Sequence, residues 1–332
     1  METIKLTSSE LALLWTTYMN ESMTVCFFQY FLEIVEDKEI RPIVEYALEL
    51  NQKHVKKITE IFTDEGNAIP LGFTDKDVNL NAPRLFSDQF ILDYVNSTAK
   101  YTLNLNSLAL ANSTRSDIRN FYAELLASTT ELFQRSTEVM LSKGIYIRPP
   151  YIPVQEKVEL VQEQSFLNGW IGDRRPLNAI EMSLLFFNMT RNILGANLLT
   201  GFSQVAQSQQ VRDFMLRGKK IAQKHVEIFS SILRENDILS PMPWDTAVTQ
   251  SIVAPFSDKL IMFHVTALIA GGIGYYGAAA GTSARRDLGV QYARLTAEIA
   301  QYAEDGANIM IKNQWLEQPP TVPDRKALAS KL

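Results

Sequence analysis

The tetrapeptide QKHV at residues 52–55 recurs unchanged at residues 223–226, a shift of 171 positions. Further matches follow at this shift, or at a shift of 170 after one single-residue deletion, over about 145 residues. The other matching segments are 9–14 with 180–185, 86–88 with 256–258, 122–123 with 292–293, and 149–150 with 319–320. A nearly constant shift over this length indicates an internal duplication of a domain-sized unit.

The duplication divides the 332 residues into three parts. We define unit one as residues 1–153, the connector as residues 154–176 and unit two as residues 177–332. The middle of the connector, residues 156–164, is charged and is predicted to form a short helix.

Apolar residues at steps of three and four predict four helices in each unit. The predicted helices cover residues 8–36, 37–65, 88–111 and 116–143 in unit one, and residues 178–207, 209–236, 257–281 and 285–314 in unit two. Short links join helix one to helix two and helix three to helix four, so each pair is expected to be an antiparallel hairpin.

The loop between helices two and three, here called the middle loop, covers residues 66–85 in unit one. About 20 extended residues can span about 66 Å, whereas a helix of about 28 residues is about 42 Å long. The loop can therefore cross the bundle, as in ferritin-like folds. We predict an all-α fold of two tandem four-helix, ferritin-like bundles. Each should end in a Pro-rich tail, which in unit one (residues 148–153) is expected to be extended and packed along the bundle.

Composition excludes several classes of protein. A hydrophobic fraction of 46% rules out a disordered chain, and a net charge of −5 argues against nucleic acid as a partner. The single cysteine, Cys26, excludes an intrachain disulfide and a cysteine-based zinc site. No secretory signal is recognisable near the N-terminus, and we expect a cytoplasmic protein.

Residues 260–284 contain no Asp, Glu, Lys or Arg, and a run of this length could span a bilayer. The repeat aligns this run with helix three of unit one, which carries Asp93 and Lys100. We therefore predict no transmembrane segment. The run is expected to form the most buried helix, at a contact between units or subunits.

The two histidines of the repeated tetrapeptide, His54 and His225, lie where a ferritin-like bundle would bind metal. A di-iron bundle uses Glu-x-x-His motifs, with the glutamate three residues before the histidine. Asn51 and Ala222 occupy these positions instead. A normal dinuclear carboxylate site is therefore not expected.

The sequence still allows a degenerate site for a single metal ion in unit one. If the helices are aligned at their hairpin turns, Glu21, His54 and Glu124 fall at one level of the bundle. The alternatives for His54 are a hydrogen-bonded core histidine and a solvent-exposed histidine, and we favour a protein without a cofactor. In unit two the corresponding residues are Asn192, His225 and Arg294, and no metal is expected there.

The other polar residues shared by the two units are predicted to be structural. Glu10 and Glu181 lie in the first turn of helix one, where a carboxylate stabilises the helix dipole. Arg115 and Asp117 are expected to form an ion pair at the turn before helix four. Cys26 lies in an apolar helix and is expected to be a buried filler.

The sequence resembles the tandem ferritin-like members of the domain of unknown function 3231 family of spore-forming Gram-positive bacteria. The segments that carry the resemblance are YIRPPYIP at 146–153, GDRRPLN at 172–178, RRDLGV at 285–290 and YAEDGAN at 302–308. The resemblance implies a four-helix, ferritin-like fold and a cytoplasmic, forespore or spore-associated location. It implies no activity and no catalytic residues, and the spore-coat relation is a label only.

Two functions are compatible with these observations. The first is a non-enzymatic structural or interaction protein, spore- or stress-associated, that binds itself or other proteins through apolar helix faces and the Pro-rich tails. The alternative is a protein that binds a metal or a small apolar ligand at a degenerate site in unit one. No arrangement of catalytic residues is recognisable, so an enzyme is the less favoured class.

Overall fold

The computed structural model describes residues 4–170, 174–239 and 247–330. Unit one contains the four helices α1 (Ser8–Ile34), α2 (Arg41–Asp64), α3 (Asp88–Ala111) and α4 (Ser116–Ser142). Unit two contains α5 (Ala179–Val205), α6 (Gln209–Arg234), α7 (Asp258–Thr282) and α8 (Arg286–Lys312). Three short elements are η1 (Asp75–Asp77), η2 (Gln164–Leu167) and α9 (Arg325–Ala329). The predicted all-α fold with two tandem halves is confirmed.

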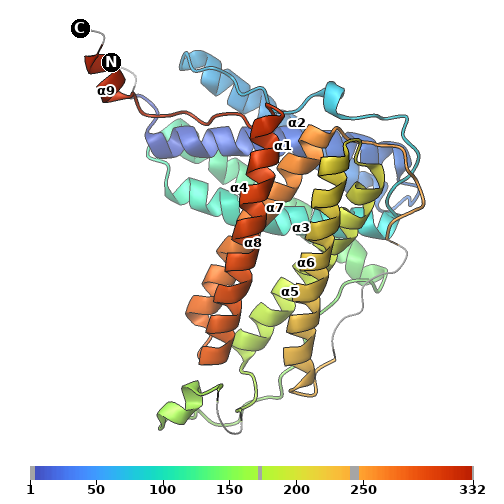
Figure 1. Ribbon diagram of the computed structural model, residues 1–332, viewed down its shortest axis with the longest axis vertical. Helices are drawn as coiled ribbons and strands as arrows, with labels where there is room; N and C mark the ends of the chain where they lie inside the picture. The colour runs from blue at the N-terminus through green and yellow to red at the C-terminus, as the bar shows by residue number, and fades with distance from the viewer. Residues whose placement is uncertain (1–3, 171–173, 240–246, 331–332) are drawn as a thin grey trace.

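The two units lie across one another. In Figure 1 the helices of unit two run along the long axis of the molecule, and those of unit one cross it. Contacts between the units join α1 with α7 and α3 with α5. The remaining helices, α2 and α4 in unit one and α6 and α8 in unit two, complete each bundle by packing on these four.

The segments that end the two middle loops, residues 77–87 before α3 and residues 247–257 before α7, pair with each other in an antiparallel manner. One isolated bridge joins Val78 to Phe256, and a second joins Phe86 to Val248. The shift of 170 residues converts the first bridge into the second, because 78 + 170 is 248 and 86 + 170 is 256. The flanking backbone hydrogen bonds obey the same rule, since Ser87 N–H donates to Ala247 and Ser257 N–H donates to Asp77. The units are therefore related by an approximate two-fold axis through the paired loops.

Aromatic side chains make the core continuous across this axis. Phe27 of α1 packs on Phe256 with ring centroids 4.2 Å apart and on Phe202 of α5 at 6.1 Å. All three rings are buried in one apolar cluster that extends through both units. Burying a side chain of this size contributes about 1.5–3 kcal/mol, so the two bundles stabilise each other.

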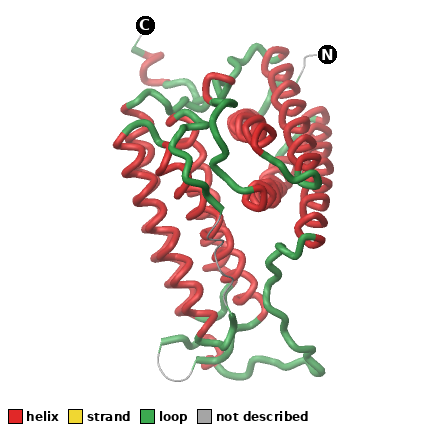
Figure 2. The backbone as a smooth tube through the Cα atoms, turned by 90° about the vertical axis from the view of Figure 1, so that its right-hand side faces the viewer, coloured by secondary structure: helices red, strands yellow, loops and turns green. Residues whose placement is uncertain are grey.

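The connector does not contain the predicted helix at residues 156–164. Residues 156–163 have no regular structure, and the short element η2 begins at Gln164. A helix of about ten residues is marginal in water unless it buries an apolar face, and side chains such as Val158 and Leu160 are exposed. Figures 1 and 2 show this segment running along the outside to the end of unit two that lies far from unit one.

The tail at residues 148–153 is extended as predicted, and residues 148–152 line a cavity together with Ala179, Met182 and Ser183 of α5. Ile145, Tyr146 and Ile147 pack against the core, whereas Tyr151 is 80% exposed. The tail therefore lies beside the start of α5, with most of its side chains exposed.

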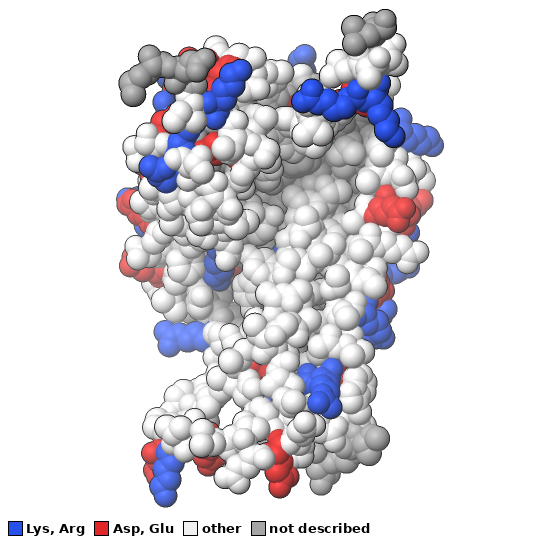
Figure 3. Space-filling view, turned by 90° about the vertical axis from the view of Figure 1, so that its left-hand side faces the viewer, with Lys and Arg blue, Asp and Glu red and all other residues white. Residues whose placement is uncertain are grey.

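Helix α7 is not the most buried helix, because nine of its 25 residues are buried against 15 of 27 in α5. Its position at the contact between units is confirmed by Phe263, whose ring lies 5.0 Å from that of Phe73. Among the described residues, α7 is the one helix that is long and apolar enough to cross a membrane. Less than half of its most apolar window, 44%, is buried. The face drawn in Figure 3 carries charged side chains mainly near its edges and has a hollow without them in its upper half.

Candidate functional site

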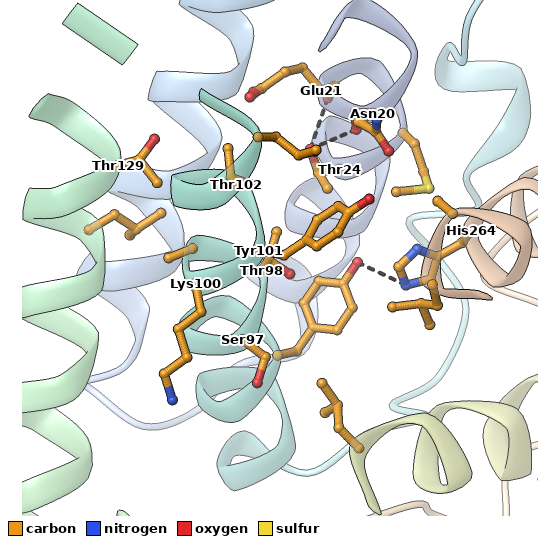
Figure 4. Close-up of a pocket in the computed structure, with 18 of the residues that line it drawn as sticks. Asn20, Glu21, Thr24, Ser97, Thr98, Lys100, Tyr101, Thr102, Thr129 and His264 are labelled. Atoms are coloured by element: carbon orange, nitrogen blue, oxygen red, sulfur yellow. Dashed lines mark hydrogen bonds between the residues drawn. The ribbon is translucent and has the colours of Figure 1, made fainter. Parts of the chain in front are cut away.

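A cavity of about 150 Å³ lies where the two bundles meet. Its wall is formed by α1, α2, α3 and α4 of unit one and by α5 and α7 of unit two. Part of the wall is apolar and includes Met23, Phe28, Leu132, Leu194, Leu198 and Leu268. An engineered apolar cavity of about this volume admits benzene, so the space suits a small molecule (Figure 4).

The unit-one side of the wall is polar and internally hydrogen-bonded. His54 Nδ1 lies 3.3 Å from Glu21 Oε2, and both side chains are buried. Asn51 donates to the hydroxyl of Thr24. Two of the three residues predicted to form a degenerate metal site, Glu21 and His54, are thus brought together in the cavity wall.

The third predicted residue, Glu124, is exposed and does not line the cavity. The equivalent contact in unit two shows which residue of the last helix faces the histidine, because His225 Nε2 lies 3.2 Å from Glu298 Oε2 of α8. The repeat places Ser128, not Glu124, at the position of Glu298. The prediction that Glu124 faces His54 is therefore wrong by one helical turn. It treats the helices as parallel, whereas packed helices cross at an angle. No group of three His, Cys, Asp or Glu suited to a metal occurs in the part of the chain that the structure describes.

His225 itself is fully buried within unit two. Its Nδ1 lies 2.9 Å from the hydroxyl of Tyr276, so both ring nitrogens have partners. Burial lowers the pKa of His225, and the nearby carboxylate of Glu298 partly offsets that effect. His225 is therefore a hydrogen-bonded core histidine, the role that the sequence offered as an alternative for the equivalent His54.

Tyr94 and His264 meet in the cavity wall near the approximate two-fold axis. They are equivalent positions, since 94 + 170 is 264, and the tyrosine hydroxyl lies 3.2 Å from His264 Nε2. His264 is only 5% exposed, and its Nδ1 has no hydrogen-bond partner among the residues that the structure describes. Burial lowers the pKa of His264 to about 3, so the ring is neutral near pH 7. In Figure 4 the ring of His264 lies across the cavity from Tyr101.

On the side of the cavity that unit two forms, α5 contributes one positively charged side chain, that of Arg191. Its guanidinium lies 4.3 Å from the ring centroid of Tyr275 and 5.9 Å from that of Phe187. Among the described residues it has no ion pair or hydrogen bond, and burial lowers its pKa. Arg191 also lines a second cavity of about 90 Å³ inside unit two.

Two further charged residues line the cavity on α3. Burial raises the pKa of Asp93 to about 6, and the nearby charge of Lys100 opposes this shift. The ammonium of Lys100 lies over the rings of Tyr146 and Phe133, at 5.0 and 5.8 Å. Figure 4 shows Lys100 directed away from Tyr101 and His264.

These wall residues were missed at the sequence level, although one signal existed. Arg191 is the only charged residue between Glu181 and Arg212. A single charge in a long apolar helix is a candidate for a buried functional group, because charges are seldom buried without a partner. His264 likewise lies within the uncharged run at 260–284.

The repeated glutamates are structural, as predicted. Glu10 accepts hydrogen bonds from the backbone N–H groups of Thr7, Thr114 and Arg115 and thereby ties the start of α1 to the start of α4. Glu181 makes the equivalent bond to the Arg285 backbone. The predicted ion pair of Arg115 and Asp117 is present at 2.7 Å.

Cys26 is buried, as predicted, and burial raises its thiol pKa to about 12. Its environment is that of a structural cysteine and not of a nucleophile.

The fold and cavity define an all-helical protein in which two tandem four-helix units share one core and enclose a polar-lined space. The chain belongs to the family described as "Protein of unknown function (DUF3231)", whose model matches residues 1–158 and 165–328. A solved structure from Bacillus halodurans C-125, described as a "putative spore coat protein", is similar to 45% of this chain over 98% of its own length. The identity is 19% and the TM-score 0.42. No curated protein matches the chain.

Proposed function

We propose that this protein is a non-enzymatic binding protein that holds one small ligand in the cavity between its two bundles. The observation that carries the proposal is the cavity wall, where the buried Nδ1 of His264 has no hydrogen-bond partner within the described parts of the chain. A buried polar atom without a partner costs about 1–3 kcal/mol, and a ligand that supplies the missing hydrogen bond removes this cost.

A comparison of the two halves supports the proposal. Residues with a structural role are the same at equivalent positions of the two units. Glu10 corresponds to Glu181, and Arg115 corresponds to Arg285. The cavity wall instead differs between equivalent positions. Tyr101 corresponds to Gly271, and a Cβ atom at 271 would lie 2.7 Å from the Tyr101 ring. Replacement of a side chain by hydrogen at this position makes room for the tyrosine that lines the cavity.

Filling the cavity tests this function. Gly195 lines the cavity, and a Cβ atom added there would contact nothing within 4 Å. Gly277 is a matched control, since it is also helical and unobstructed but exposed. We expect benzene to raise the melting temperature of the wild type and of Gly277→Leu but not of Gly195→Leu. Equal responses of the two variants, or no response of the wild type, would refute the proposal.

Self-association is a second candidate, favoured by the exposed apolar side chains of the connector. Val154, Val158 and Leu160 are each at least 80% exposed. We propose that two chains associate through this segment. Light scattering coupled to size exclusion should show a dimer or larger assembly that dissociates in Val158→Asp/Leu160→Asp. A wild type that stays monomeric at millimolar concentration excludes the candidate.

Two inferences from the sequence stand as further proposals. We propose that the protein needs no metal, so zinc, iron or manganese should leave the melting temperature of the wild type and of His54→Ala equal to that of the metal-free proteins. Stabilisation of the wild type alone would instead support a site at His54. We also propose a spore-related role in the cytoplasm or forespore, on the basis of the family resemblance. A fluorescent fusion should then accumulate during sporulation, and constant vegetative expression would contradict it.

A further inference from the structure

The ligand class can be inferred from the charges around the cavity, an inference that rests on the proposed function. We propose that the ligand is a small monocarboxylate with an apolar body of roughly the size of a benzene ring, and that the guanidinium of Arg191 binds its carboxylate.

Arg191 has the properties of an anion receptor. Its guanidinium stacks on the ring of Tyr275, and stacking leaves the N–H groups at the edge of the plane free to donate. Those groups have no acceptor among the described residues, and the side chain is half-buried. A desolvated charge without a counter-ion is unfavourable. A carboxylate matches the planar fork because two parallel N–H···O bonds can form.

The other charged groups of the wall do not occupy this receptor. Glu21 is paired with His54, and Asp93 forms no ion pair with Arg191. The ammonium of Lys100 lies over two aromatic rings of unit one. In this wall the opposite charges of Asp93 and Lys100 offset each other, and the guanidinium of Arg191 has no counter-ion among the described residues. One positive charge is therefore left, so a monoanion fits better than a phosphate dianion.

The surroundings of Arg191 also define the body of the ligand and its entry. Leu194 and Leu198 follow Arg191 on the same helix by one and two turns, and Leu268 faces the cavity from α7. These side chains offer an apolar surface next to the cation. Asn104 is exposed and donates to the hydroxyl of Tyr275 at 3.1 Å, so the Arg191 end of the cavity is close to the surface.

Three probes of one shape test the proposal by isothermal titration calorimetry. Benzoate carries the carboxylate, benzyl alcohol is neutral and phenyl phosphate is a dianion. We expect the wild type to bind benzoate at least tenfold more tightly than either of the others. Arg191→Met should lose about 10- to 100-fold in benzoate affinity, the usual worth of a hydrogen-bonded charge, and keep its affinity for benzyl alcohol. Arg191→Lys should retain part of the benzoate preference.

A matched control is Arg217→Met. Arg217 also stacks on an aromatic ring, 5.1 Å from that of Tyr302, but it lies at the surface and is paired with Asp305. This variant should bind all three probes as the wild type does. Equal wild-type affinities for benzoate and benzyl alcohol, or stronger binding of phenyl phosphate, would overturn the carboxylate inference and leave the binding function intact. If the wild type binds none of the three probes, both the carboxylate inference and the proposed binding function are overturned. The comparison of the probes on the wild type tests the inference even if Arg191→Met does not fold.

Discussion

The carboxylate of Glu10 provides the clearest quantitative prediction. It is fully buried and accepts hydrogen bonds from the backbone N–H groups of Thr7, Thr114 and Arg115, at 2.8 Å each. These bonds outweigh the opposing effect of burial and lower the pKa of Glu10 from 4.5 to about 2. A shift of this size corresponds to about 3 kcal/mol of stability.

The sign of the pH dependence follows from the lowered pKa. The unfolded carboxyl takes up a proton near pH 4.5, whereas the folded one does so near pH 2. The stabilisation is therefore complete above pH 4.5 and is lost as the pH falls toward 2. Glu10→Gln should remove it, because the amide has one acceptor oxygen and presents an NH₂ group to N–H donors. We expect the variant to be about 2–3 kcal/mol less stable at pH 7 and nearly equal to the wild type at pH 2.

Urea unfolding followed by circular dichroism, at several pH values between 2 and 7, measures this difference. Glu124→Gln is the control, because Glu124 is exposed and should change stability by less than about 0.5 kcal/mol. A loss below about 0.5 kcal/mol for Glu10→Gln at pH 7, or a loss that persists unchanged at pH 2, would refute the reasoning.

Three further predictions concern packing and burial. Gly218→Ala should destabilise unit two by about 1–3 kcal/mol, since its Cβ would lie 2.2 Å from the buried hydroxyl of Tyr302. Gly277→Ala, which meets nothing, should stabilise by up to about 1 kcal/mol, and thermal melts compare the two. Cys26, with its pKa raised to about 12, should react with a thiol reagent in denaturant but not in the native state, and rapid native labelling would contradict its burial. His264, with its pKa lowered to about 3, should remain uncharged in the folded protein while the unfolded chain takes up a proton below pH 6.5. Stability should therefore fall between pH 6.5 and pH 3, and less so in His264→Asn; parallel melting curves for the two proteins would exclude this role.

Local features of this protein were predictable because they depend on residues close in sequence. The helix at Ser8–Ile34 follows from its apolar spacing, and the repeat transfers the same assignment to Ala179–Val205. Glu10 was recognisable as structural from its place in the first turn. The connector was predicted less well. Its charged residues indicated a helix, but the apolar side chains of this segment are exposed in the fold, and the sequence does not reveal their exposure.

The cavity could not be predicted to the same extent. His54 and Glu21 were correctly placed at one level, since they belong to adjacent helices joined by a short turn. Glu124 was misplaced because its helix is reached through a long loop, and small crossing angles change the level by a full turn. The partner of His264, Tyr94, comes from the other unit, and Arg191 stacks on Tyr275 from a different helix of its own unit. No spacing rule relates residues that lie 170 or 84 positions apart in the sequence.

The sequence by itself determined that this chain is a duplicated helical unit, because helix periodicity and a constant shift between matching segments are properties of local order. Only the tertiary structure decided how the two copies face each other. The paired middle loops place Tyr94 opposite His264 and bring the guanidinium of Arg191, which has no ion pair within residues 4–170, 174–239 and 247–330, into a space between the bundles. That space depends on packing across an interface, where the free energy of burial is shared by residues distant in sequence, and it is there that the proposed ligand binds.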